Sequence, residues 1–308
     1  MRLIGLLFKV RLILIFVVSL ILLPKLNAAG ATTGSFLLVN IDARETALGG
    51  IFSPYYARPG AASVNPACLQ GIKNKYIAFS HYSSVFSSHY EQIEYAQPLN
   101  VSSAAAVSFM YSTIDDLSRT DSTGEVVERI DNYDAVLGLS YSFVINEQFN
   151  AGINLKFVTE KIYNTVNMGG TINLGLLYRN FDSRYTIGAD IENLGLSTSY
   201  FKDKSLYPML CRAGCGMEVY RFEEKYKISL FMEERIFLLE QDNTETSIGL
   251  EAAYEKFFTF RYGYTLGKTD GRVAVGAGVR LSDMFIDYAY QPYFISDNAH
   301  RITIKYMF

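Results

Sequence analysis

Apolar and polar residues alternate along most of this chain, from residue 75 to its last residue. Within 133–144, the side chains of Leu137, Leu139 and Tyr141 fall on one face of an extended chain. Gly138 and Ser140 fall on the other face. Such alternation predicts β-strands with one apolar face. Segments of about the 9–11 residues that a tilted membrane strand needs are 75–85, 89–98, 102–112, 133–144, 148–158, 169–179, 184–192, 208–220, 225–233, 246–254, 257–265, 272–281, 284–291 and 299–308.

The connections between these segments alternate in length. Short periplasmic turns that alternate with longer external loops are typical of outer-membrane barrels. We therefore predict an all-β fold, a transmembrane up-and-down antiparallel barrel of about fourteen strands, with twelve as the nearest rival. The short connections are 99–101, 145–147, 180–182, 221–224, 255–256 and 282–283, and the long ones are 113–132, 159–168, 193–207, 234–245, 266–271 and 292–298. The first hairpin, near 86–88, is short where a long loop is expected.

The last strand carries its own signal. Its alternate residues are apolar, and an aromatic residue precedes the terminal Phe by two positions. This ending resembles the strand by which the barrel-assembly machinery recognises outer-membrane barrels, although an edge strand of a soluble sheet has a similar pattern. The candidate assembly residues are Ile302, Ile304, Tyr306 and Phe308.

The first residues read as an export signal. Arg2, Lys9 and Arg11 precede an apolar run over 12–23, and small residues follow near Ala28. This is the pattern of a cleaved secretory signal peptide, here residues 1–28, with an N-terminal membrane anchor as the alternative. Export together with the barrel pattern predicts the outer membrane of a Gram-negative-type bacterium, where outer-membrane lipids surround the protein.

Residues 29–74 lack the strand pattern. The segment is rich in small and apolar residues, unlike a polar linker. Eight strands already form a barrel filled by side chains, so a barrel of about fourteen strands has an interior to fill. We predict that 29–74 forms a hatch inside the lumen of a barrel that comprises 75–308.

Composition excludes several classes of function. The chain has 28 basic and 31 acidic residues without a basic stripe, so no nucleic-acid partner is expected. Its three cysteines, Cys68, Cys211 and Cys215, do not form a disulfide framework. We find no nucleophile, phosphate-loop or metal-site motif, and therefore predict no enzyme, no cofactor and no metal. The acidic residues of 115–134 lack EF-hand spacing and predict a solvated loop.

Two further sets of residues are candidates for ligand contacts. Positive side chains that face inward are able to hold a carboxylate head group, although pairing with inward acids is the favoured alternative. Apolar residues in external loops need burial or a ligand. The positive candidates are Lys156, Arg212, Arg261, Arg280 and Arg301, the acids are Asp134, Asp190, Glu192, Glu218, Glu251 and Asp287, and the apolar candidates are Leu194, Leu196, Tyr200, Phe201, Phe237 and Leu238.

Several motifs occur in a characteristic order. Residues 43–50 read Ala-Arg-Glu-Thr-Ala-Leu-Gly-Gly and end on Gly49 and Gly50, and the Asn65-Pro66-Ala67 triplet follows before the barrel. With the stretches at 260–264, 276–281, 286–293 and 300–302, this order resembles the FadL-like group. That group includes long-chain fatty acid transporters, PorV/PorQ proteins and uncharacterised spirochaetal relatives. The resemblance implies a fourteen-strand barrel, a hatch that blocks the lumen, and hydrophobic ligands that pass a pocket and leave through the wall.

Two classes of function remain open from the sequence. The first is a conduit for long-chain fatty acids or other hydrophobic small molecules. The second is a PorV-like protein that binds secreted cargo for a secretion system without transport. A weaker alternative is a surface antigen or adhesin that binds through its external loops.

Overall fold

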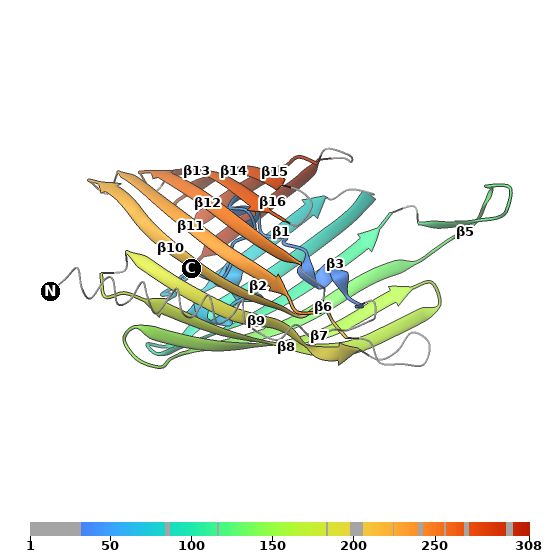
Figure 1. The fold of residues 1–308 in the computed structure, drawn as a ribbon, viewed down its shortest axis with the longest axis horizontal. Coiled ribbons are helices and arrows are strands. Elements are labelled where there is room, and N and C mark those ends of the chain that lie inside the picture. The colour runs from blue at the N-terminus through green and yellow to red at the C-terminus, as the bar shows by residue number, and fades with distance from the viewer. Residues whose placement is uncertain are drawn as a thin grey trace.

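The computed structural model describes residues 32–83, 87–115, 117–182, 184–197, 206–223, 225–239, 243–255, 257–267, 271–293 and 298–308. These residues form one closed barrel of fourteen strands (Figure 1). The barrel strands are β1 (Tyr76–Ser83), β2 (Ser88–Asn100), β3 (Ser103–Ile114), β6 (Asn132–Val144), β7 (Phe149–Ile162), β8 (Thr165–Arg179), β9 (Tyr185–Ser197), β10 (Leu210–Phe222), β11 (Tyr226–Phe237), β12 (Thr244–Tyr254), β13 (Phe258–Leu266), β14 (Gly271–Leu281), β15 (Met284–Gln291) and β16 (Ala299–Met307).

Each barrel strand pairs with the next one along the chain, and all pairs are antiparallel. The barrel closes between β1 and β16, where Tyr76 lies opposite Met307. Between β3 and β6 the chain forms a separate hairpin, β4 (Ser118–Thr120) and β5 (Val126–Arg129), which projects beyond the rim (Figure 1). The predicted fourteen-strand antiparallel barrel is confirmed, and the twelve-strand alternative is wrong.

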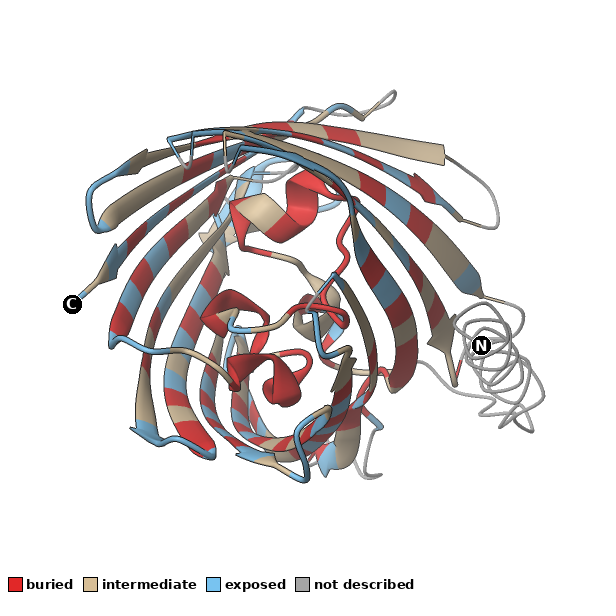
Figure 2. Cartoon of the chain, turned by 90° about the vertical axis from the view of Figure 1, so that its left-hand side faces the viewer, coloured by how far each residue is buried: buried red, intermediate tan, exposed pale blue. Residues whose placement is uncertain are grey.

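Side chains alternate across the wall as the sequence pattern requires. In β6, Leu137, Leu139 and Tyr141 are exposed on the outside, whereas Ser140 and Ser142 are buried on the inside. The stripes of buried and exposed residues along the strands in Figure 2 show the same alternation around the barrel. An apolar outer band around a polar interior is the arrangement that a barrel adopts in lipid.

Three predicted loops are partly strand. β7 reaches Ile162 and β8 begins at Thr165, so 159–168 is a tight turn with its flanking strands. β9 continues to Ser197 and β11 to Phe237, beyond the predicted ends at 192 and 233. Near the rim both faces of a strand lie outside the apolar band. The apolar alternation therefore fades there although the backbone pairing continues.

Residues 32–75, here called the luminal segment, run through the barrel interior (Figure 2). The segment begins at the long-loop end, where the Thr33 amide donates to the Leu206 carbonyl. It finishes at the short-turn end, where Lys75 and Phe308 exchange two backbone hydrogen bonds. Its helical turns are η1 (Ser35–Leu38), α2 (Ala43–Ala47), η2 (Pro59–Ala61) and η3 (Pro66–Leu69).

In the described part of the chain, no helix has the length and hydrophobicity to cross a membrane. The predicted signal peptide, residues 1–28, lies outside the described residues. The boundary between signal peptide and hatch therefore stays a prediction.

Candidate ligand site in the barrel lumen

The lower part of the luminal segment, residues 41–75, packs against glycines of the inner wall. A Cβ atom at Gly188 of β9 would overlap the Ser53 carbonyl, and one at Gly263 of β13 would overlap the Gly49 amide. Because only glycine leaves this space, segment backbone and wall backbone are in direct contact. The wall glycines that meet this part of the segment are Gly152, Gly175, Gly188, Gly214, Gly249, Gly263 and Gly276.

The motif residues of the segment have identifiable structural roles. Asn65 caps η3 by accepting from the Ala67 amide, and its Nδ2 donates to the Ser53 and Leu176 carbonyls. Gly49 and Gly50 have φ of 80° and 74°, a left-handed conformation that favours glycine. The Gly49 carbonyl accepts from the Ser247 and Thr265 hydroxyls. These motif residues therefore anchor the segment.

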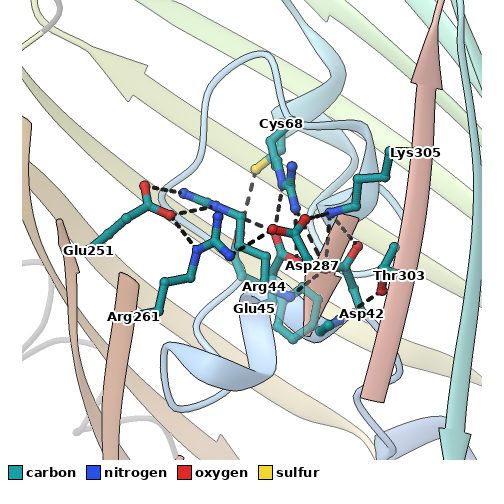
Figure 3. Close-up of polar contacts among 12 residues, drawn as sticks. Asp42, Arg44, Glu45, Cys68, Glu251, Arg261, Asp287, Thr303 and Lys305 are labelled. Carbon is teal, nitrogen blue, oxygen red and sulfur yellow. Dashed lines mark hydrogen bonds and ion pairs between the residues drawn. The ribbon is translucent and has the colours of Figure 1, made fainter. Parts of the chain in front are cut away.

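Eight charged side chains, five of them buried and three partly buried, join the lower part to the wall in one closed ring, here called the charge ring (Figure 3). Four side chains come from the segment and four from strands β12, β13, β15 and β16. Acids and bases alternate around the ring, so every charge has two opposite neighbours. In order, the contacts are Arg58–Glu45 (2.7 Å), Glu45–Arg44 (3.3 Å), Arg44–Glu251 (2.8 Å), Glu251–Arg261 (2.8 Å), Arg261–Asp287 (2.7 Å), Asp287–Lys305 (3.0 Å), Lys305–Asp42 (3.1 Å) and Asp42–Arg58 (3.5 Å).

The two acids at the start of α2 have different protonation tendencies. Burial, reinforced by the Glu45 carboxylate, raises the pKa of Asp42 to about 7, against the attraction of Lys305 and Arg58. Burial also acts to raise the pKa of Glu45, but Arg58 and the hydrogen bond with Asp42 lower it well below its usual value. Asp42 is therefore the proton-accepting member of the pair, and it also caps α2 through the Arg44 amide.

The upper part of the segment, residues 32–40, packs against an apolar chamber in the long-loop half of the barrel. A cavity of about 60 Å³ lies between the luminal segment and the wall. Its lining includes Phe36 of the upper part, Asp42 of the lower part, and Met110, Val136, Lys156 and Arg212 of the wall. Its volume is that of about two water molecules. The apolar cluster of the chamber comprises Phe36, Ile41, Tyr82, Met110, Val136, Val158, Tyr207 and Ala299.

Few polar contacts hold the upper part. The Glu160 carboxylate of β7 accepts from the Thr33 hydroxyl at 2.9 Å and the Gly34 amide at 3.1 Å. Near the lower boundary, Arg301 donates to the Asn40 carbonyl at 2.7 Å. Glu160 was not among the residues that the sequence pattern singled out, although an inward acid near a strand end was a detectable signal. Tyr207, at the end of the predicted loop 193–207, is buried in the apolar cluster of the chamber.

The predicted luminal cations differ in their partners. Arg212 pairs with Glu192 and with Glu233 at 3.2 Å, and Arg261 pairs with Glu251 and Asp287. For these two residues, the pairing alternative is correct. Lys156 is buried and donates to Asn193 Oδ1 at 3.2 Å, and no described carboxylate lies within ion-pair distance of it.

Two further cations of the predicted set do not pair with described acids. The Arg301 guanidinium lies 3.6 Å from the centroid of the Tyr82 ring beside the chamber. Arg280 does not join the luminal set, because it lies at the short-turn end, donates to the Ser282 carbonyl and stacks over Phe285. The alternation of inward and outward residues along its strand correctly predicts that Arg280 faces inward. That alternation does not show how far along the barrel axis a residue lies.

The predicted external apolar contacts are mostly wall residues. Leu194 and Leu196 belong to β9 and Phe237 belongs to β11, so their assignment to loops is wrong. Leu238 follows β11, and its amide donates to the Met209 carbonyl. Tyr200 and Phe201 lie outside the described residues. The candidate assembly residues are exposed on the outer face of the last strand; they are Ile302, Ile304, Tyr306 and Phe308. Their role in assembly stays a prediction.

The described residues offer no grouping of three or more His, Cys, Asp or Glu side chains suited to a metal ion. The three cysteines are free. His81, His89 and His300 contact Glu91, Asp115 and Tyr288 respectively, near the long-loop rim. The candidate site is the apolar cluster and the adjoining cavity, whose lining includes the Lys156 ammonium.

No protein-family model matches the chain. No curated protein sequence matches it either. Among solved structures, the toluene transporter TbuX of Ralstonia pickettii has 14% identity and a TM-score of 0.59, over 89% of this chain and 100% of that one. The toluene transporter TodX of Pseudomonas putida has 14% identity and a TM-score of 0.59, over 92% and 99%.

A FadL homologue from Pseudomonas aeruginosa has 11% identity and a TM-score of 0.57, over 90% of this chain and 99% of that one. Identities this low compare folds only. The chain has a FadL-like barrel fold.

Proposed function

We propose that this protein is an outer-membrane conduit for hydrophobic small molecules that carry a carboxylate, with long-chain fatty acids as the best-fitting class. The observation that carries the proposal is the apolar chamber with the Lys156 ammonium in its lining. The FadL-like fold and the apolar outer band support the location. The proposal assigns no enzymatic activity, and it keeps assembly through the terminal strand as a prediction.

Lys156 distinguishes an acid from a neutral hydrocarbon. A buried ammonium is costly to keep without a carboxylate partner, and Lys156 has a single amide oxygen as its described acceptor. A ligand carboxylate would form a charge-assisted hydrogen bond with it, while the alkyl chain lies against Met110 and Val136. Arg212 contributes less, because Glu192 and Glu233 already neutralise it.

The chamber has to enlarge before such a ligand binds. Its cavity of about 60 Å³ is small beside the 300–1,000 Å³ of typical ligand pockets. The upper part of the luminal segment occupies the remaining space with Phe36, and Tyr207 adjoins it from the wall side. We therefore propose that the ligand displaces the upper part and takes over its apolar contacts.

The test is displacement of a fluorescent long-chain fatty acid from the folded, detergent-solubilised barrel by oleate, with oleyl alcohol as the neutral competitor. We expect saturable displacement, and about tenfold weaker oleate binding in Lys156→Met, as expected for loss of one charge-assisted contact. Binding of oleyl alcohol should not change. Lys225→Met, an exposed lysine at the short-turn end, is the matched control. If Lys156→Met weakened the binding of oleate and of oleyl alcohol equally, the carboxylate site would be contradicted. Absence of saturable binding would contradict the conduit.

A PorV-like role in binding secreted cargo, without transport, is the second candidate. The observation that favours it is that the chain's own side chains fill the lumen, while the β4–β5 hairpin extends beyond the rim with Val126 and Val127 exposed by 64% and 54%. Exposed apolar residues on a projecting hairpin suit a protein partner. A folded barrel that binds no fatty acid, and loses cargo binding on deletion of 118–129, would support this role. The antigen or adhesin reading is weaker because it has no observation of its own.

A further inference from the structure

A second pocket lies on the outer wall at the long-loop rim, at the base of the β4–β5 hairpin. It has a volume of about 420 Å³ and lies where β3 leaves the barrel and β6 enters it. Its lining includes Tyr111, Arg129, Asp131, Tyr133 and Lys161. The pocket is separate from the chamber, so its role does not depend on what the lumen carries.

The pocket has a rigid frame. The Asn132 side chain bridges to the backbone of Ile114 with two hydrogen bonds of 2.8 Å. The Ile130 amide donates to the Leu117 carbonyl at 2.8 Å, and the Tyr163 amide donates to the Asp131 carbonyl at 2.9 Å. The hairpin base is therefore fixed to β3 and to the β7–β8 turn, and the pocket is already formed.

The lining of the pocket carries charges of both signs. The rings of Tyr111 and Tyr133 stack at 5.9 Å, and the Lys161 ammonium lies 5.9 Å from the centroid of the Tyr133 ring. Lys161 also pairs with Asp131 at 3.5 Å. The four charged side chains of the lining are Asp115, Arg129, Asp131 and Lys161, so acids and bases are equal in number. A ligand with both a phosphate and an ammonium matches such a pocket better than a simple anion.

The surface just below the pocket is apolar. Three apolar residues lie side by side on the outer faces of β3, β6 and β7, namely Phe109, Leu137 and Phe157. Phe109 is one outward position below Tyr111, and Leu137 is two outward positions below Tyr133. The three side chains are exposed by 44%, 40% and 56%. A molecule whose head group occupies the pocket would therefore extend its tails along these side chains, which is the geometry of a membrane lipid.

We propose that this pocket binds the zwitterionic head group of one diacyl phospholipid of the surrounding membrane. The phosphate contacts Lys161 and Arg129, and the ammonium lies between Asp131 and the tyrosine rings. Bound there, the lipid links the hairpin base to the barrel wall. The location in a membrane is taken from the proposed function, whereas the identity of the luminal ligand is not needed.

The test is native mass spectrometry of the full-length barrel released from detergent, with equal amounts of phosphatidylethanolamine and phosphatidylglycerol that share the same acyl chains. We expect one phosphatidylethanolamine to be retained preferentially. Lys161→Gln should lower that retention by about tenfold, which corresponds to loss of one charged contact. Tyr133→Leu should weaken the preference for the ammonium lipid while it preserves apolar surface. Lys225→Gln is the matched control, because that lysine also lies over two tyrosines, Tyr226 and Tyr254, at the opposite end.

The retention of the two lipids by the variants distinguishes a specific site from general lipid binding. Preferential retention that Lys161→Gln abolishes and Lys225→Gln preserves supports it. Equal retention of both lipids, or equal effects of the two lysine variants, overturns it, because the lipid then binds as a general annulus. Displacement of the lipid by inorganic phosphate alone also overturns it in favour of a free-phosphate site. Heat-modifiable migration of every variant on gels shows that the barrel is folded.

Discussion

The two parts of the luminal segment are bound to the same barrel by different kinds of contact. The lower part, residues 41–75, touches wall glycines through its backbone and shares the charge ring with four strands. The upper part, residues 32–40, rests on apolar side chains and on a few hydrogen bonds, two of them to Glu160. The cost of displacing a segment follows from the contacts it loses. We therefore infer that the lower part is a fixed plug and the upper part is the replaceable wall of the ligand chamber.

The largest effect on the difference between the two parts is expected when one charge is removed from the charge ring. Lys305→Met leaves Asp42 and Asp287 without their shared cation in a buried site, and we expect a loss of about 3–5 kcal/mol in stability. Thermal unfolding followed by circular dichroism measures it, and single-channel conductance reports whether the plug has moved. Arg119→Met, which breaks an exposed pair with Glu128, should change stability by about 0–1 kcal/mol. Equal effects of the two variants would show that the ring does not hold the plug.

A glycine substitution tests the backbone contact. Gly188→Ala places a methyl group against the Ser53 carbonyl, so wall and plug have to separate, at an expected cost of about 1–3 kcal/mol. Gly170→Ala, on neighbouring β8, meets its nearest atom at 3.3 Å and should cost less. The same thermal and conductance measurements apply. A Gly188→Ala barrel as stable as the Gly170→Ala control would argue against direct packing.

The protonation of Asp42 gives a pH-dependent test of the lower part. Its pKa, raised from 3.8 to about 7, means that the folded state binds the proton more tightly than the unfolded state. Its contribution to stability is therefore present below the unfolded value and is lost as the pH rises through about 7. Asp42→Asn keeps an oxygen for the Arg44 amide but does not titrate. We expect the change in melting temperature between acidic and alkaline buffer to be smaller in this variant. An identical pH dependence would contradict the assignment.

The smallest structural effect is expected in the upper part. Glu160→Gln weakens the contacts with Thr33 and Gly34, with an expected cost of about 1 kcal/mol because neutral acceptors replace charged ones. Fatty acid binding should become tighter or faster, since the ligand displaces this part more easily. Stopped-flow fluorescence with the labelled fatty acid measures the rate. Glu147→Gln, in the exposed β6–β7 turn, is the control. Unchanged fatty acid binding in Glu160→Gln would show that the ligand does not displace the upper part when it enters.

The barrel itself was predictable because its signal is local. Each strand needs one apolar face and one small or polar face, and that pattern appears within about ten residues. The strand ends were less predictable, as β7 and β8 show, because rim residues face water or the polar lumen and lose the apolar alternation. The inward orientation of Arg261 and Arg212 also followed from the alternation of inward and outward residues along their strands. Their partners required knowledge of which strands lie opposite the luminal segment.

The sequence by itself determined the strand number, the inward and outward faces, and the presence of a non-strand segment before the barrel, since these depend on residues close together in the chain. Only the tertiary structure decided that wall glycines meet the Ser53 and Gly49 backbone, that Asp42 and Lys305 close a ring, and that Lys156 donates to an amide oxygen rather than to a carboxylate of the described residues. These contacts join residues that are far apart in the chain. They arise when the barrel closes around the segment, which no local pattern encodes.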